Sequence, residues 1–249
     1  MIELDHSEYH FLKPVFPDNH NYVEIPMIVN QKRGRAWLDS KHKPHLGILY
    51  CGDMTFIEGD GEPDQVIEPV SEVAERTLEI CCDRRFGDVL GKVFPKIQPM
   101  TNLMFEHDSI HYRHDLISGF ELRKLDEELY VKLGETGEHW LVSMYKDYED
   151  FKNTCGYGYA VFKDEKVVSA ATAFGFDGKR ADIGIATNPE FRNLGLAKAC
   201  TSKLIGELRA NGIGPVWITT PDNIASKTVA EENGFSVELE FPTFWTHVE

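Results

Sequence analysis

One short segment in the second half of the chain has the residue types that can hold a phosphate group. An arginine is followed after two residues by a glycine and then by a small residue, in the run Arg192, Asn193, Leu194, Gly195, Leu196 and Ala197. The first backbone N–H groups of a helix lack partners within the helix and carry partial positive charge. Gly195 allows an anion to approach closely, and Arg192 adds a full positive charge. The segment predicts a phosphate-binding turn, although a plain strand–turn–helix connection also uses a glycine.

The elements around this segment are those needed to position such a turn. Residues 181–187 read as a strand that enters it, and residues 196–210 as a long amphipathic helix that leaves it. The other elements predicted for this half are strand 120–125, helix 126–132, helix 147–151, strand 158–162, strand 167–174, strand 216–219, helix 223–233 and strand 235–244. The order β-α-α-β-β-β-α-β-α-β predicts an α/β (α+β) fold in which helices flank a mixed central sheet.

The first half of the chain has a less regular pattern and predicts a separate region. Residues 35–38 and 46–50 look like short strands or buried turns, and residues 54–61 read as a strand that runs into a tight turn. Residues 70–82 form either a helix or a helix followed by a strand. We therefore divide the chain into an N-terminal mixed α/β region, 1–117, and a second domain, 118–249. The N-terminal region is either a cap over the site or a degenerate copy of the second domain. It contains no second turn of the Arg192 type.

Composition excludes several classes of protein. The formal net charge is −15, which disfavours binding to a nucleic-acid phosphate backbone and is compatible with a cationic small molecule. No apolar stretch is long enough for a membrane span, and the N-terminus does not resemble a signal peptide. The five cysteines form no regular framework, as expected for reduced thiols in a cytoplasmic protein.

Three histidines could be considered as metal ligands. His107, His111 and His114 would share one face of a helix, and 107–111 is similar to a zinc-binding HExxH motif with Asp in place of Glu. Nothing else in the sequence supports a metalloprotease, and histidines of the surface or core are the commoner outcome. We predict no metal.

The turn and its neighbours resemble the GNAT superfamily of N-acyltransferases, whose signature is Q/R-x-x-G-x-G/A after the fourth strand. The lead-in 188–192, the hairpin 158–174 and the helix 223–235 also resemble that superfamily, so the likeness covers 118–249. Residues 156–161, 167–169, 181–187 and 215–217 look like the subgroup typified by zwittermicin A resistance proteins.

The resemblance implies that acetyl-CoA is the acyl donor and that 192–197 hold its pyrophosphate. It also implies that the backbone of Ile185, Ala186 and Thr187 pairs with the pantetheine arm, and that Asn223, with Ser226 nearby, helps to hold this arm. A helix N-cap is a second interpretation of Asn223.

Catalytic roles are also implied by the resemblance. Relatives often place a glutamate at the start of the fourth strand, where this chain has Asp182, so Asp182 is a candidate general base for the attacking amine. The other interpretation of Asp182 is a polar residue at a strand edge. The tyrosine that often protonates the departing thiolate is replaced by Ala230, and Tyr157 or Tyr159 could substitute for it.

Together these features predict an acetyl-CoA-dependent N-acetyltransferase acting on a small amine. The alternatives are a non-catalytic acyl-CoA-binding module and a protein N-acetyltransferase. The sequence leaves open the acceptor, the acyl length and the oligomeric state, for which a homodimer is one option.

Overall fold

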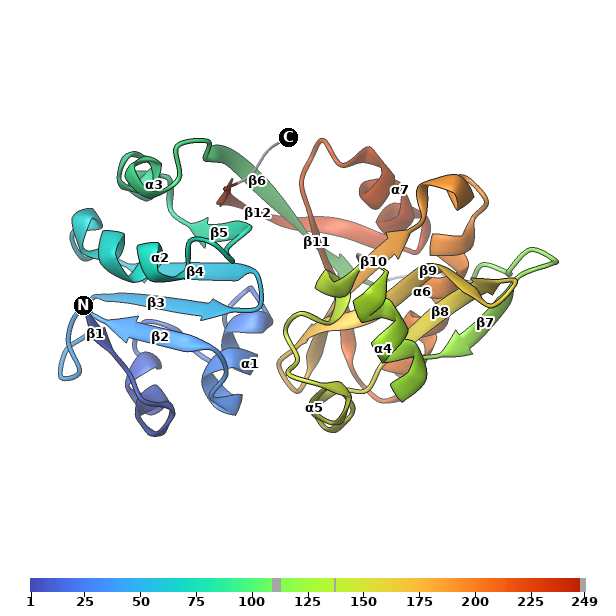
Figure 1. Ribbon diagram of the computed structural model, residues 1–249, viewed down its shortest axis with the longest axis horizontal. Coiled ribbons are helices and arrows are strands. Elements are labelled where there is room, and N and C mark those ends of the chain that lie inside the picture. The colour runs from blue at the N-terminus through green and yellow to red at the C-terminus, as the bar shows by residue number, and fades with distance from the viewer. Residues whose placement is uncertain (109–112, 137, 247–249) are drawn as a thin grey trace. The chain divides into compact units, whose positions relative to one another are not determined.

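The computed structural model describes residues 1–108, 113–136 and 138–246, and the chain divides into two compact units (Figure 1). Unit 1 comprises Met1–Asn102 and Glu240–Glu249, and unit 2 comprises Leu103–Leu239. The chain passes from unit 1 to unit 2 within strand β6 (Gln98–His107) and returns within strand β12 (Phe235–Trp245).

Unit 2 contains a mixed sheet that carries the predicted turn. Its strands lie in the order β6-β11-β10-β9-β8-β7. Their bounds are β7 Glu121–Lys124, β8 Gly158–Lys163, β9 Lys166–Phe176, β10 Arg180–Thr187 and β11 Gly214–Thr219. Neighbouring strands are antiparallel except β10 and β11, which are parallel. The mixed sheet predicted from the sequence is confirmed.

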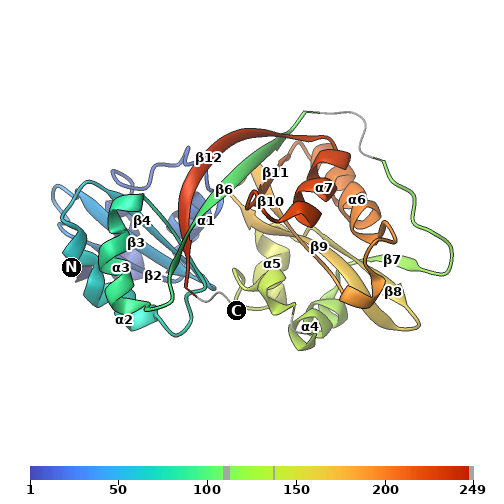
Figure 2. The same cartoon turned by 90° about the horizontal axis from the view of Figure 1, so that it is seen from above.

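The helices of unit 2 begin where the sequence supplies a cap. Helix α4 (Glu127–Glu135) begins after Asp126, whose side chain accepts from Leu129 N, and α5 (Tyr148–Thr154) begins after Asp147 in the same way. The 3₁₀ turn η4 (His139–Val142) lies between them. Helices α6 (Leu196–Ala210) and α7 (Ile224–Glu232) cover one face of the sheet, and α4 and α5 lie on the other (Figure 2).

The core of unit 2 packs α6 against the middle of the sheet. Leu204 and Leu208 of α6 are fully buried against Val161 and Ile183 of the strands, together with Trp217 of β11. Leu204 and Leu208 recur at the spacing of one helix face, which is the pattern that predicted the helix. Burial of this apolar stripe fixes α6, and with it the turn at its N-terminus.

In unit 1 the sheet strands lie in the order β1-β2-β3-β4-β5-β12, and their pairing is also mixed. The bounds are β1 Ile2–Glu3, β2 Arg35–Leu38, β3 Leu46–Cys51, β4 Met54–Gly59 and β5 Glu79–Cys82. Its helical segments are η1 His6–Leu12, α1 Glu24–Gln31, η2 Pro63–Val66, α2 Ile67–Val73, η3 Arg84–Phe86 and α3 Gly87–Val93. Residues 70–82 are therefore the end of a helix followed by a strand. Val70 and Leu90 pack from α2 and α3 onto Ile48 and Ile80 of the sheet.

The two units follow the same order of elements. In unit 1, antiparallel β2, β3 and β4 are followed by α2, by β5 parallel to β4, and by α3. In unit 2, antiparallel β8, β9 and β10 are followed by α6, by β11 parallel to β10, and by α7.

The strand that follows the last helix of each unit completes the sheet of the other unit. Strand β6 follows α3 and pairs with β11 in the register Val216↔Glu106 to Thr219↔Leu103. Strand β12 follows α7 and pairs with β5. This exchange is the physical reason why the observed division, after residue 102 and again after residue 239, differs from the predicted boundary at 117/118.

Within the part of the chain that the structure describes, no helix is long and apolar enough to cross a membrane.

Candidate functional site

The predicted turn lies between the end of β10 and the start of α6. After Thr187 the side chain of Asn188 accepts from Glu190 N at 3.0 Å and opens a short 3₁₀ turn, η5 (Pro189–Phe191). Asn193 and Gly195 then have positive φ angles of 62° and 75°. Two left-handed residues turn the chain sharply into the helix, and the glycine adopts this conformation without strain.

The start of α6 presents backbone N–H groups that could hold an anion. Gly195 is the N-cap, and among the described residues no side chain caps the first turn, which begins with Leu196 and Ala197. A Cβ added at Gly195 would have Lys198 Cε, at 3.9 Å, as its nearest neighbour, so the space above the turn is open. Uncapped N–H groups at a helix start, beside a residue without a side chain, fit the pyrophosphate of coenzyme A.

Two cationic side chains border this turn. Arg192 is exposed, and its Nε donates to the carbonyl oxygen of Thr187 at 3.3 Å, which holds the guanidinium at the turn. Lys198, in the first turn of α6, forms an ion pair with Glu232 at 2.5 Å. Sequence reasoning missed Lys198. Its position three residues after the turn glycine was the available signal.

Among the described residues, no strand pairs with the edge of β10 that lies beside the turn. β10 and β11 pair only at Arg180↔Gly214, Ala181↔Pro215 and Asp182↔Val216, although both strands continue beyond this point.

The open edge carries backbone groups that a ligand can reach. On the other side of β10, Asn188 N donates to Val168 O. The alternation of an antiparallel pair then directs the N–H and C=O groups of Ile185 and Thr187 away from β9, towards the open edge. A pantetheine arm could add there like a strand.

Asp182 lies where this edge begins. It is the last residue of β10 that pairs with β11, and the residue is only 8% exposed. The β9–β10 register shifts directly after it, because Phe174 is an extra residue of β9 between the partners of Asp182 and Ile183. Ile183 faces the α6 core, so strand alternation places Asp182 on the opposite face, together with Gly184.

Asn223 caps α7, as one of its two interpretations predicted. Its Oδ1 accepts from Ser226 N at 3.1 Å, and Ser226 Oγ in turn accepts from the indole N–H of buried Trp217 at 2.9 Å. Both residues therefore fix the helix that follows β11.

The tyrosines suggested as proton donors lie away from the open edge. Ala230 is fully buried in the core. Tyr159 lies on β8, and β9 separates this strand from β10. Burial raises the pKa of the Tyr159 hydroxyl, and the nearby Glu207 carboxylate raises it further, so this hydroxyl is a weaker acid than usual. Tyr157 lines a cavity of about 450 Å³ near the C-terminal end of α6, with Lys124 among the other lining residues.

Two of the three predicted histidines make hydrogen bonds at the end of α7. His107 Nε2 bonds to Asn233 O at 3.0 Å, and His114 Nε2 bonds to Glu232 O at 2.8 Å. Arg209 contacts the other nitrogen, Nδ1, of His107 at 2.7 Å, and an arginine can only donate. His111 lies outside the described residues. The described pair satisfies carbonyl groups that the helix leaves without partners.

Comparison with known proteins agrees with this geometry. The sequence profile of the family described as GNAT acetyltransferase matches residues 13–244. The chain is 28% identical over 257 residues to an uncharacterized N-acetyltransferase, YdfB, of Bacillus subtilis, and the match covers 98% of each chain.

Solved structures show the same fold. A GCN5-related N-acetyltransferase-like protein from Streptococcus suis superposes with a TM-score of 0.79 at 20% identity, covering 97% of this chain and 99% of that one. A tandem GNAT protein from the clavulanic acid biosynthesis pathway superposes with a TM-score of 0.61 at 10% identity, covering 98% and 95%. Because the family profile spans most of its length, the chain belongs to the GNAT acetyltransferase family, N-acetyltransferases that use acetyl-CoA as acetyl donor.

Proposed function

We propose that this enzyme acetylates an amine of a small molecule, with acetyl-CoA held along the open edge of β10 and the start of α6. The observation that carries the proposal is the end of β10–β11 pairing at Asp182↔Val216, which leaves a strand edge leading to an uncapped helix start. In this proposal the pyrophosphate lies on the amides of 192–197, and Arg192 and Lys198 neutralise its charge.

Asp182 is the proposed general base. The neutral amine nitrogen attacks the thioester carbonyl, the C–N bond forms, and the C–S bond breaks. The nitrogen gives its proton to the Asp182 carboxylate, directly or through a water, and coenzyme A leaves as the thiolate. A thiol with an ordinary pKa of about 8.5 is a tolerable leaving group, so the proposal needs no tyrosine as acid.

We further infer that unit 1 is a degenerate copy of the same fold and binds no acetyl-CoA. The support is its order of elements, which matches that of unit 2. A solved structure with the same fold is described as a tandem GNAT protein.

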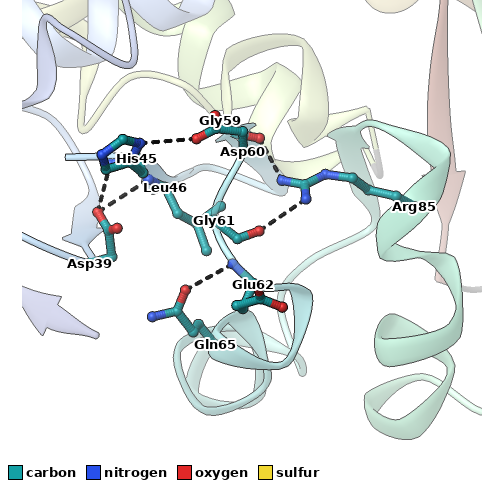
Figure 3. Close-up of polar contacts among 9 residues, drawn as sticks. All are labelled: Asp39, His45, Leu46, Gly59, Asp60, Gly61, Glu62, Gln65 and Arg85. Carbon is teal, nitrogen blue, oxygen red and sulfur yellow. Dashed lines mark hydrogen bonds and ion pairs between the residues drawn. The ribbon is translucent and has the colours of Figure 1, made fainter.

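In unit 1, side chains bond to the backbone of the turn that corresponds to 192–197 (Figure 3). Arg85 donates to Gly59 O at 2.6 Å and to Gly61 O at 2.9 Å. Glu62 is the N-cap of η2, the 3₁₀ turn that leads into α2, whereas the N-cap of α6 is glycine. The N–H of Glu62 donates to Gln65 Oε1 at 3.1 Å. A carboxylate at the start of the helix disfavours a second anion there.

The resemblance to the zwittermicin A resistance subgroup rests on sequence alone and agrees with a small-molecule acceptor. The net charge of −15 also favours a cationic acceptor over an anionic one.

The decisive experiment measures thiol release from acetyl-CoA with a panel of small amines and with peptides. Turnover of small amines is the expected result. Acetylation of peptides alone would identify a protein N-acetyltransferase instead. Tight acetyl-CoA binding without turnover on either panel would favour the non-catalytic module.

A further inference from the structure

We infer that Trp140 and Glu138 form an anchor for a positive charge on the acceptor, so that the enzyme prefers acceptors with a second ammonium group. This inference rests on the proposed function, and its argument starts from Gly184 of β10. A Cβ at this residue would lie 3.0 Å from Leu141 Cδ2 and 3.2 Å from Trp140 Cζ3. The glycine therefore lets η4 lie directly on β10.

The contact between η4 and the sheet is held by polar and apolar partners. Thr172, which pairs with Gly184 across β9 and β10, donates its hydroxyl to Leu141 O at 2.7 Å. Leu141 itself is fully buried. These contacts fix the backbone of η4. Trp140, which precedes Leu141, is therefore held in a fixed position on this face of the sheet.

In this position the aromatic ring of Trp140 is partly exposed to solvent. The residue is 36% exposed, although large apolar side chains are usually covered. Its indole N–H donates to Glu138 Oε2 at 3.0 Å, and its ring lies 6.0 Å from the ring of Phe174. An exposed indole held by a carboxylate and a second ring is preorganised rather than free to rotate.

This pair lies on the face of β10 that carries Asp182. Asp182 is two residues before Gly184 on the strand, a separation of about 7 Å. An indole face attracts organic cations, and the adjacent carboxylate strengthens that attraction. An acceptor that binds with one ammonium group on Trp140 and Glu138 could therefore place a second amine at Asp182. A short aliphatic diamine has two amines at a suitable spacing.

The test compares putrescine with butylamine, which have the same carbon chain and differ by one ammonium. The full-length enzyme should show a higher kcat/KM for putrescine. We expect Trp140→Ala to reduce the putrescine-to-butylamine ratio about tenfold, Glu138→Gln to reduce it as well, and Trp140→Phe to retain most of it. The KM for acetyl-CoA should not change in any of them.

The matched control is Trp245→Ala, because Trp245 of unit 1 is 38% exposed and its loss should leave the ratio unchanged. Intact turnover with an unchanged ratio in Trp140→Ala and Glu138→Gln would overturn the anchor and leave the proposed function standing.

If neither amine is turned over, that result counts against the proposed function but does not test the anchor. A binding measurement then tests the anchor. Putrescine is then titrated calorimetrically into the full chain saturated with coenzyme A. Binding that Trp140→Ala weakens supports the anchor. Absence of binding, or binding that the variant leaves unaltered, overturns it.

Discussion

Asp182, the proposed general base, is a single carboxylate at the end of the β10–β11 ladder. We expect Asp182→Asn to lower kcat by about a hundredfold, because general-base catalysis contributes roughly 10²–10⁴ in rate. Affinity for acetyl-CoA, measured by calorimetry, should stay within about twofold, since the proposed cofactor contacts lie further along the chain. Glu190→Gln, an exposed change near the turn, is the control. An Asp182→Asn enzyme with wild-type kcat would exclude this residue as the base.

Gly195 carries the prediction for cofactor binding. An alanine there keeps a strained φ of 75° and adds a methyl group to the surface on which we place the pyrophosphate. We expect wild-type chain to bind one acetyl-CoA and Gly195→Ala to bind it at least about tenfold more weakly, an effect equal to about 1.4 kcal/mol. Calorimetric titration gives both values.

Gly212 provides the matched control for this substitution. Its φ is 73°, a Cβ there would meet nothing within 4 Å, and it follows the opposite end of α6. Gly212→Ala should lower the free energy of unfolding by about as much as Gly195→Ala does, and it should leave the affinity for acetyl-CoA unchanged. Equal losses of affinity in both variants would mean that strain, and not cofactor contact, explains the effect.

At the scale of elements, the end of α7 depends on a neutral histidine. Burial and then the Arg209 guanidinium lower the pKa of His107. A histidine with a lowered pKa in the folded state is more readily protonated in the unfolded state. Its stabilising contribution is complete above the unfolded pKa of about 6.5 and is lost as the pH falls through the lower, folded value.

We therefore expect the free energy of unfolding to decrease as the pH falls below about 6.5, and His107→Gln to make this decrease shallower. Urea titrations across this range measure the effect. His10→Gln is a suitable control, because His10 is exposed and its hydrogen bond, to Ser7 O, is local. The same slope in wild type and His107→Gln would contradict the assignment.

Elements with local signals were predictable from the sequence, and those fixed by distant partners were not. The bounds of α6 follow from the spacing of its buried residues and from the Asn211–Gly212 end, and both α4 and α5 follow their aspartate caps. Strand β6 was missed, because it begins beside Pro99 and its partner β11 lies more than a hundred residues away.

Some residues of the candidate site could likewise be predicted from the sequence, and others could not. The turn carries its own signature in Arg192 and Gly195, which sequence reasoning can recognise. Trp140 and Glu138 have no such pattern, since their relation to Asp182 arises only when η4 packs on Gly184. No spacing in the sequence encodes that contact.

At the scale of the whole molecule, the exchanged strands predict how truncations behave. A fragment of residues 118–249 lacks β6, so β11 loses its antiparallel partner and exposes a strand edge. We expect this fragment to aggregate, and a fragment that begins at Gln98 to be more soluble because it restores β6. Size-exclusion chromatography of both fragments measures the difference. A monodisperse, folded fragment 118–249 would show that β6 is dispensable.

The exchange of β6 and β12 also sets a limit on folding during synthesis. The sheet of unit 1 obtains its last strand from Thr243–Trp245, which the ribosome makes long after β5, because the residues of unit 2 lie between them in the sequence. The edge of β5 must therefore stay unpaired while the residues of unit 2 are being made. Chaperones that shield nascent chains should matter more for this protein than for two domains that are each complete in sequence.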